Sequence, residues 1–68
     1  IESLTGPIVR GDIGTVEEHL SALRDMKSHK RIYRALSLTA LDMARERKTC
    51  SREILDTLER ILEVTDEG

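Results

Sequence analysis

One stretch near the start of the chain decides how the rest is interpreted: Leu4-Thr5-Gly6-Pro7-Ile8-Val9-Arg10-Gly11-Asp12-Ile13-Gly14-Thr15. It contains the only proline and three of the four glycines of the 68-residue sequence. Gly-Pro is a turn signal, and glycine lets the backbone adopt positive φ angles or approach other groups closely. We therefore expect an ordered Gly/Pro loop here, held in place by the helices that follow.

The sequence after this stretch predicts three helices with short breaks. Thr15-Val16-Glu17-Glu18 has the pattern of a capping box, which would start the first helix. Ser51 is a suitable N-cap for the last helix. The apolar residues recur at helical spacing, and they set the expected ranges at Val16 to about Met26, about Lys30 to Arg47, and Arg52 to about Val64. The predicted fold class is all-α, three helices preceded by the ordered Gly/Pro loop.

The middle predicted helix is apolar around most of its circumference. Residues at spacings of three and four form one face, and further apolar residues leave little polar surface between Ala35 and Ala44. Such a helix lies at the centre of a bundle or in an interface. The residues that we expect in a dimer or domain interface are Ile32, Leu36, Ala40 and Met43.

Length and composition exclude several classes of protein. A chain of 68 residues is near the lower limit for independent stability, and its single cysteine cannot form an intrachain disulfide, so a partner surface is expected. The net charge of −2, spread over both signs, argues against nucleic acid as the main partner. The sequence has neither a metal-ligand spacing nor an apolar run long enough for a membrane. One free cysteine is typical of a cytoplasmic protein.

Arg10 and Asp12 are the candidate functional side chains of the Gly/Pro stretch, and two interpretations of them stay open. In the first, they form a local pair that braces the turn, with Asp12 also accepting hydrogen bonds from the amides that follow. In the second, the planar guanidinium of Arg10 binds an anionic substrate or a cofactor phosphate. The tripeptide Arg10-Gly11-Asp12 also matches an adhesion motif, but such matches are common by chance.

The remaining polar residues have structural interpretations. His19 lies at the edge of an apolar stripe and is expected to be partly buried, because a proton-transfer role needs a partner that the sequence does not identify. Tyr33 is expected at the rim of the core, and Cys50 as a buried or idle thiol. Dinucleotide fingerprints, P-loops, nucleophile elbows and zinc motifs are absent from the sequence. No catalytic residue can be named, and membership of an enzyme stays open.

A longer pattern links these segments. It consists of Leu4 to Asp12, then Thr15, His19-Leu20 and Leu23, then Tyr33-Arg34-Ala35-Leu36 with Ala40-Leu41 and Ala44. This pattern resembles the C-terminal helical domain of a poorly characterised group of Rossmann-like, NAD(P)-dependent oxidoreductases. That domain is similar to the C-terminal domain of 6-phosphogluconate dehydrogenase. The resemblance covers about Leu4 to Ala44.

The resemblance implies that residues 1–68 are a C-terminal helical domain and that a nucleotide-binding domain, absent from this chain, precedes it. In such enzymes the helical domain forms the homodimer and closes over the nicotinamide end of the cofactor. The chain alone would then bind no cofactor and would be inactive. The expected cleft residues are Thr5, Gly6, Pro7, Arg10, Gly11 and Asp12. The alternative is a non-enzymatic helical module for protein–protein interaction.

Overall fold

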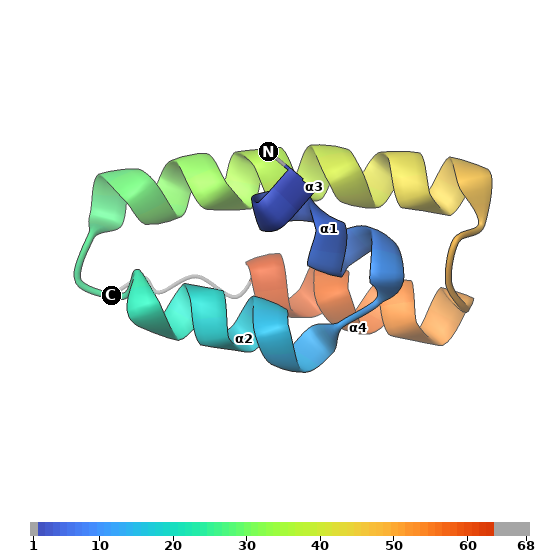
Figure 1. The fold of residues 1–68 in the computed structure, drawn as a ribbon, viewed down its shortest axis with the longest axis horizontal. Helices are drawn as coiled ribbons and strands as arrows, with labels where there is room; N and C mark the ends of the chain where they lie inside the picture. Colours follow the sequence, from blue (N-terminus) through green and yellow to red (C-terminus); the bar gives the residue numbers. More distant parts are fainter. Residues whose placement is uncertain (1, 64–68) are drawn as a thin grey trace.

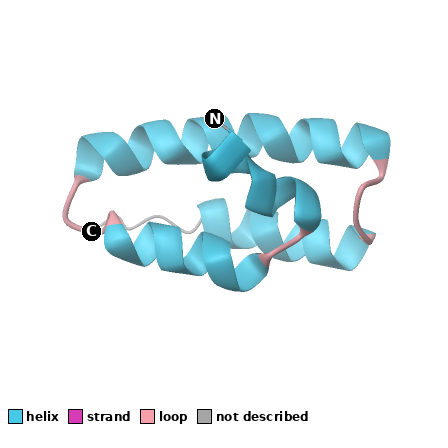
Figure 2. Cartoon of the chain, in the orientation of Figure 1, coloured by secondary structure: helices cyan, strands magenta, loops and turns pink. Residues whose placement is uncertain are grey.

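The computed structural model describes residues 2–63, with side chains described from Thr5 onward. The described residues form four helices joined by short loops (Figures 1 and 2). Their bounds are α1 Glu2–Arg10, α2 Ile13–Ala22, α3 Lys27–Arg47 and α4 Arg52–Glu63. The prediction of an all-α fold is confirmed. Within residues 2–63, no helix combines the length and the apolar character that crossing a bilayer requires.

The four helices pack in two layers with α1 across them. The long helix α3 lies along one side of the molecule, and α2 and α4 lie along the other (Figure 1). Helix α1 packs mainly against α3 and also contacts α2, while α4 packs against both α3 and α2. The end of α1 therefore reaches the place where the other helices meet.

All four helices contribute to one aliphatic core. Each fully buried aliphatic side chain stabilises the fold by about 1.5–3 kcal/mol relative to an exposed one. The buried apolar residues are Ile8, Val16, Tyr33, Ala40, Leu41, Ala44, Leu55, Leu58 and Leu62. In α4 they recur at spacings of three and four, so the predicted apolar stripe of this helix is confirmed.

The first stretch of the chain is a helix where we expected a loop. Helix α1 runs through Gly6 and Pro7 to Arg10. A proline inside a helix removes one backbone hydrogen bond and costs about 3 kcal/mol or more. Here Pro7 and Ile8 both lie in the buried interior, and Ile8 is fully buried. Burial of these two side chains offsets the cost, which is why the turn signal was misleading.

The turn comes after Arg10 and sets the start of α2. Gly11 has a φ of +71°, and the amides of Gly11 and Asp12 donate to the carbonyl oxygens of Ile8 (3.1 Å) and Pro7 (2.8 Å). These bonds form a Schellman motif, with glycine in its usual place. The carboxylate of Asp12 then caps α2 by accepting from the Thr15 amide at 3.2 Å.

The predicted capping box at Thr15 is therefore wrong, because Asp12 caps the helix three residues earlier. Helix α2 also ends at Ala22, before the expected Met26, which is 44 % exposed. The cap at Ser51 is confirmed, since its hydroxyl accepts from the Ile54 amide at 3.2 Å. The last predicted residue of the final helix, Val64, lies outside the described residues.

The four residues of α3 that we expected in an interface differ in their exposure. Ala40 is buried in the core, Leu36 is half-buried, and Ile32 and Met43 are 62 % and 46 % exposed. Ala40 therefore differs from the other three residues, and the interface itself stays a prediction. A helix that is apolar all round does not reveal which side its neighbours cover. The buried residues of α3 are Tyr33, Ser37, Ala40, Leu41 and Ala44.

Candidate functional site

Three of the predicted cleft residues lie together on α1. Thr5, Gly6 and Arg10, with Val9, line a hollow of about 300 Å3, here called the α1 hollow. Residues four apart share a face of a helix, which pairs Thr5 with Val9 and Gly6 with Arg10. A Cβ at Gly6 would lie 3.0 Å from Nη1 of Arg10. The missing side chain of Gly6 therefore gives the Arg10 guanidinium room to fold back over the helix.

Arg10 points its charged side chain at this hollow without a direct ion-pair partner among the described residues. Its side chain is exposed, and among the described residues it forms neither an ion pair nor a hydrogen bond. It acts on Asp12 only through its charge. The direct Arg–Asp brace expected from the sequence is thus not seen in residues 2–63, and the guanidinium is available to an anion.

The other predicted cleft residues do not line the α1 hollow. Pro7 is buried, Gly11 forms the turn, and Asp12 caps α2. The Thr15 hydroxyl donates to Asp12 Oδ2 at 2.7 Å, and this bond, followed by that from the Thr15 amide, lowers the pKa of Asp12 below its usual 3.8. The expected structural role of Asp12, accepting from the amides that follow it, is confirmed.

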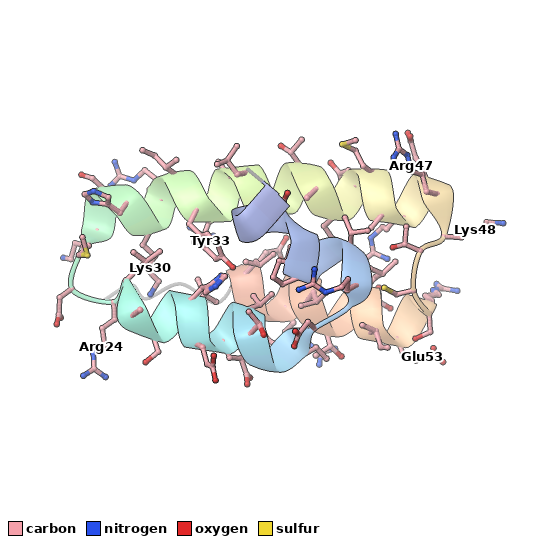
Figure 3. The ribbon with its side chains drawn as sticks, viewed as in Figure 1. Arg24, Lys30, Tyr33, Arg47, Lys48 and Glu53 are labelled. Carbon is pink, nitrogen blue, oxygen red and sulfur yellow. The ribbon has the colours of Figure 1, made fainter. Side chains whose placement is uncertain are left out.

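A second hollow connects α1 with the exposed side of α3. It measures about 120 Å3 and shares Thr5 and Val9 with the α1 hollow. Its remaining lining residues are Ala40, Met43, Ala44, Arg47 and Thr49. Figure 3 shows Arg47 near the C-terminal end of α3. The candidate cleft residue Thr5 and the candidate interface residue Met43 thus lie on one continuous surface.

A third hollow lies between α2 and the first half of α3. It measures about 200 Å3 and has an almost wholly apolar surface. We call it the apolar hollow, and its lining residues are Leu23, His29, Ile32, Tyr33 and Leu36. Two of the four predicted interface residues, Ile32 and Leu36, border it. It has room for a large apolar side chain from a partner.

A partly buried polar contact joins α2 to α3. His19 Nδ1 and the Tyr33 hydroxyl are 2.9 Å apart, and their rings meet edge to face with centroids 5.5 Å apart. Tyr33 is only 3 % exposed, and its label in Figure 3 marks it on the inner side of α3. Burial raises the pKa of Tyr33, while the neighbouring Ser37 hydroxyl opposes this rise. The expected partly buried, structural His19 is confirmed, whereas Tyr33 lies in the core and not at its rim.

The part of the sequence that contains most of these features matches a known family. The sequence model of a family described as a domain of unknown function, DUF2520, matches residues 1–40. The chain belongs to the DUF2520 family. The matched residues include α1, α2 and the first part of α3, and so the Gly/Pro stretch and the apolar hollow. No curated protein and no solved structure matches this chain.

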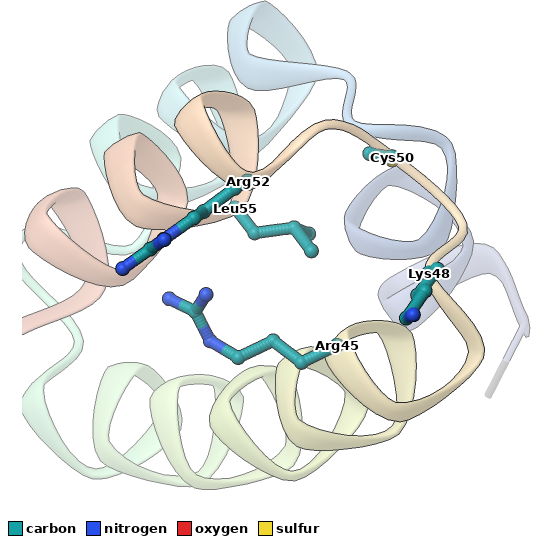
Figure 4. Close-up of a pocket in the computed structure, with 5 residues that line it drawn as sticks. All are labelled: Arg45, Lys48, Cys50, Arg52 and Leu55. Atoms are coloured by element: carbon teal, nitrogen blue, oxygen red, sulfur yellow. The ribbon is translucent and has the colours of Figure 1, made fainter.

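The DUF2520 chain has one further charged site, which sequence reasoning missed. At the corner between α3 and α4, Nη2 of Arg45 binds Asp56 at 2.9 Å and Glu59 at 2.6 Å, and these contacts raise the pKa of Arg45. Beside it is a hollow of about 350 Å3, here called the corner hollow, lined by Arg45, Lys48, Cys50, Arg52 and Leu55 (Figure 4). The only sign of this site in the sequence was that basic residues lie on both sides of the break between α3 and α4.

The described part of the DUF2520 chain offers no metal site. Among residues 2–63, no group of three or more His, Cys, Asp or Glu side chains could hold a metal ion. The same residues contain helices but no strand, and so lack the strand–turn–helix unit that binds a dinucleotide.

Proposed function

We propose that this DUF2520 chain is the helical part of an NAD(P)-dependent oxidoreductase. Its role would be to form a homodimer and to complete the substrate cleft next to a separate nucleotide-binding domain. The observation that carries the proposal is the exposed apolar row of α3, Ile32 and Met43, which continues into the surface around Thr5 and Arg10. The sequence resemblance to the helical domains of such enzymes supports it.

The exposed row supports an interface because of where it lies. Ile32, Leu36 and Met43 are spaced by four and seven residues and therefore share one face of α3. Val9 of α1, 42 % exposed, extends this face towards Met43, with which it lines the same hollow. Two copies related by a two-fold axis could bury the row against itself, as in most homodimers.

The cleft role rests on Arg10. An exposed guanidinium with no carboxylate partner among the described residues is suited to a carboxylate or phosphate on a substrate. Hydride transfer would be chemistry of the cofactor, while residues such as Arg10 would orient the substrate. We propose no catalytic residue in this chain.

Sedimentation equilibrium over a range of concentrations tests the dimer. We expect the 68-residue chain to associate, and Met43→Ser to weaken the association at least tenfold while circular dichroism stays unchanged. Met26→Gln is the control, because Met26 is equally exposed but lies at the N-cap of α3, where serine would add a helix cap. A folded monomer at all concentrations, or equal effects of the two substitutions, would contradict dimerisation through α3.

The coding sequence upstream of Ile1 tests the enzyme assignment. The proposal requires a strand, a glycine-rich turn and a helix there, the unit that binds dinucleotides. In a longer protein of that kind, Arg10→Ala should raise the KM for the substrate, with little change in melting temperature. A different type of upstream domain would rule the oxidoreductase out.

The apolar hollow favours a second candidate function, a non-enzymatic helical module for protein–protein interaction. A pocket with an almost wholly apolar surface next to Ile32 is the kind of site into which a partner helix inserts one anchoring side chain. This function needs neither a cofactor nor an upstream nucleotide domain. Leu23→Glu would abolish partner binding without affecting Arg10-dependent steps, which separates it from the first proposal.

A further inference from the structure

We propose that the corner hollow binds the phosphate group of a small phosphate monoester through Arg45, Lys48 and Arg52. The site lies beyond the residues matched to the DUF2520 family, and the inference does not depend on the proposed function. It rests on three cationic side chains from two helices around one hollow of about 350 Å3.

The charged residues that line the hollow are all cationic. Its lining residues are three cations, Cys50 and Leu55, with no acidic residue among them. In Figure 4, Arg45 extends from α3 and Arg52 from α4, with their guanidinium groups at the same end of the hollow. Lys48 lies at the opposite end, and Leu55 lies between them. An anion in the hollow would therefore have positive charge at both ends.

Arg45 is held in a fixed orientation. Both of its ion pairs, to Asp56 and Glu59, are made through Nη2. Among the described residues, its Nε and Nη1 make no hydrogen bond, although guanidinium has five N–H donors. Two carboxylates thus fix the guanidinium plane and leave donors for a ligand. A side chain ordered beforehand loses less entropy when it binds.

The backbone positions of the other two cations are set by helix caps. Lys48 ends α3 with φ 53° in a Schellman motif, in which Thr49 N donates to Ala44 O at 3.1 Å. Glycine usually occupies this position, so a lysine there carries a conformational cost. Arg52 is the first residue of α4, directly after the Ser51 cap. Positive charge at a helix N-terminus is unfavourable, and an anion beside Arg52 would relieve it.

The number of cationic side chains favours phosphate over carboxylate. Asp56 and Glu59 together outweigh the charge of Arg45, so these two carboxylates and the three cations carry a net charge of +1, while Lys48 and Arg52 have no carboxylate partner within residues 2–63. Three cationic side chains match the three acceptor oxygens of a phosphate monoester, whereas a carboxylate offers only two oxygens. The hollow is larger than one phosphate needs, and Leu55 and the Cys50 side chain offer an apolar wall to the organic part of the ester.

NMR titration tests the site with inorganic phosphate, glycerol 3-phosphate and acetate at constant ionic strength. We expect saturable shifts of the amides from Lys48 to Leu55 with both phosphates. Glycerol 3-phosphate should bind more tightly than inorganic phosphate, and acetate at least tenfold more weakly. Arg52→Gln should weaken phosphate binding at least tenfold. Arg31→Gln, an exposed arginine of α3 outside the hollow, is the matched control.

Lys48→Gly separates binding from folding. Glycine suits the left-handed conformation at position 48, so the variant should melt at a higher temperature than the parent chain while binding phosphate at least tenfold more weakly. The proposal is overturned if shifts grow linearly with phosphate, if acetate acts equally, or if Lys48→Gly and Arg52→Gln bind phosphate as tightly as Arg31→Gln.

Discussion

Gly11 lies directly against Cys50: a Cβ at position 11 would come within 2.8 Å of the Cys50 sulfur and 2.9 Å of Cγ2 of Ile54. The same sulfur donates a hydrogen bond to the carbonyl oxygen of Val9 at 3.1 Å. The end of α1 is therefore fixed against the loop between α3 and α4. This contact connects the two parts of the molecule that carry the candidate sites.

Gly11→Ala should destabilise the fold by about 2–4 kcal/mol, because it adds a left-handed alanine to an overpacked contact. Gly14→Ala is the control, since Gly14 lies within α2 and its nearest neighbour would be 4.0 Å from the new Cβ. That change should stabilise the protein by up to about 1 kcal/mol. Urea denaturation measures both, and equal effects would show that the Cys50 contact is not tight.

The stability provided by Asp12 should depend on pH. Its folded pKa is lowered, so its carboxylate stabilises the fold fully above pH 3.8 and loses this effect as the pH falls through the lowered value. The parent chain should melt at a higher temperature than Asp12→Asn at pH 6, and the difference should shrink towards strongly acidic pH. Asp25→Asn, at an exposed turn position, removes a carboxylate outside the cap and is the matched control. A difference that stays constant with pH would contradict the capping role.

Ser37→Ala should stabilise the protein by about 1 kcal/mol. The Ser37 hydroxyl is fully buried, and within the described residues it has no hydrogen-bond partner of good geometry, so removing it ends a desolvation cost. Thermal unfolding measures the gain. A loss of stability of similar size would mean that the hydroxyl makes a favourable contact.

Tyr33 should ionise only above its usual pKa of 10.0, because burial disfavours the charged phenolate. Tyr33 is the only aromatic residue among Phe, Trp and Tyr, so the absorbance of tyrosinate reports on it alone. Tyr33 loses its proton at a lower pH in the unfolded chain than in the folded chain. The free energy of unfolding is therefore unaffected by this group below pH 10, and it falls as the pH rises through the folded pKa of Tyr33. Titration at the usual value would show that the ring is accessible to water.

Leu58→Ala should cost about 2–5 kcal/mol, because Leu58 is fully buried and the change leaves a cavity. Ile32→Ala should change the stability of the monomer by less than about 0.5 kcal/mol, since Ile32 is 62 % exposed. The same Ile32→Ala should weaken dimerisation. A large loss of monomer stability from Ile32→Ala would place this residue in the core instead of the proposed interface.

Sequence periodicity located the helices better than their ends. The all-α fold, the cap at Ser51 and the apolar stripe of α4 were predictable, because spacing and cap chemistry act within a few residues. Helix α1 was not, because Gly6 and Pro7 are strong local turn signals. Their effect is overcome by burial of Ile8 against helices that are distant in the sequence.

Local sequence patterns also failed to show which residues of the candidate sites lie together. The sequence identified Arg10 but placed it in a loop with Asp12, whereas helical spacing groups it with Thr5 and Gly6. The cations of the corner hollow come from the ends of two helices, and no local pattern shows that Arg45 and Arg52 lie at one place. Which face of α3 is covered likewise depends on the packing of α1, which the periodicity of α3 does not contain.

The hydrogen bond from Cys50 to Val9 joins residues that are 41 positions apart. Docking of α1 onto the α3–α4 hairpin closes a long loop, whereas the turns within each helix pair close short ones. The rate at which the backbone amides at the end of α1 exchange with solvent hydrogen measures how often this helix detaches. That rate would time a partial opening of the molecule separately from its global unfolding.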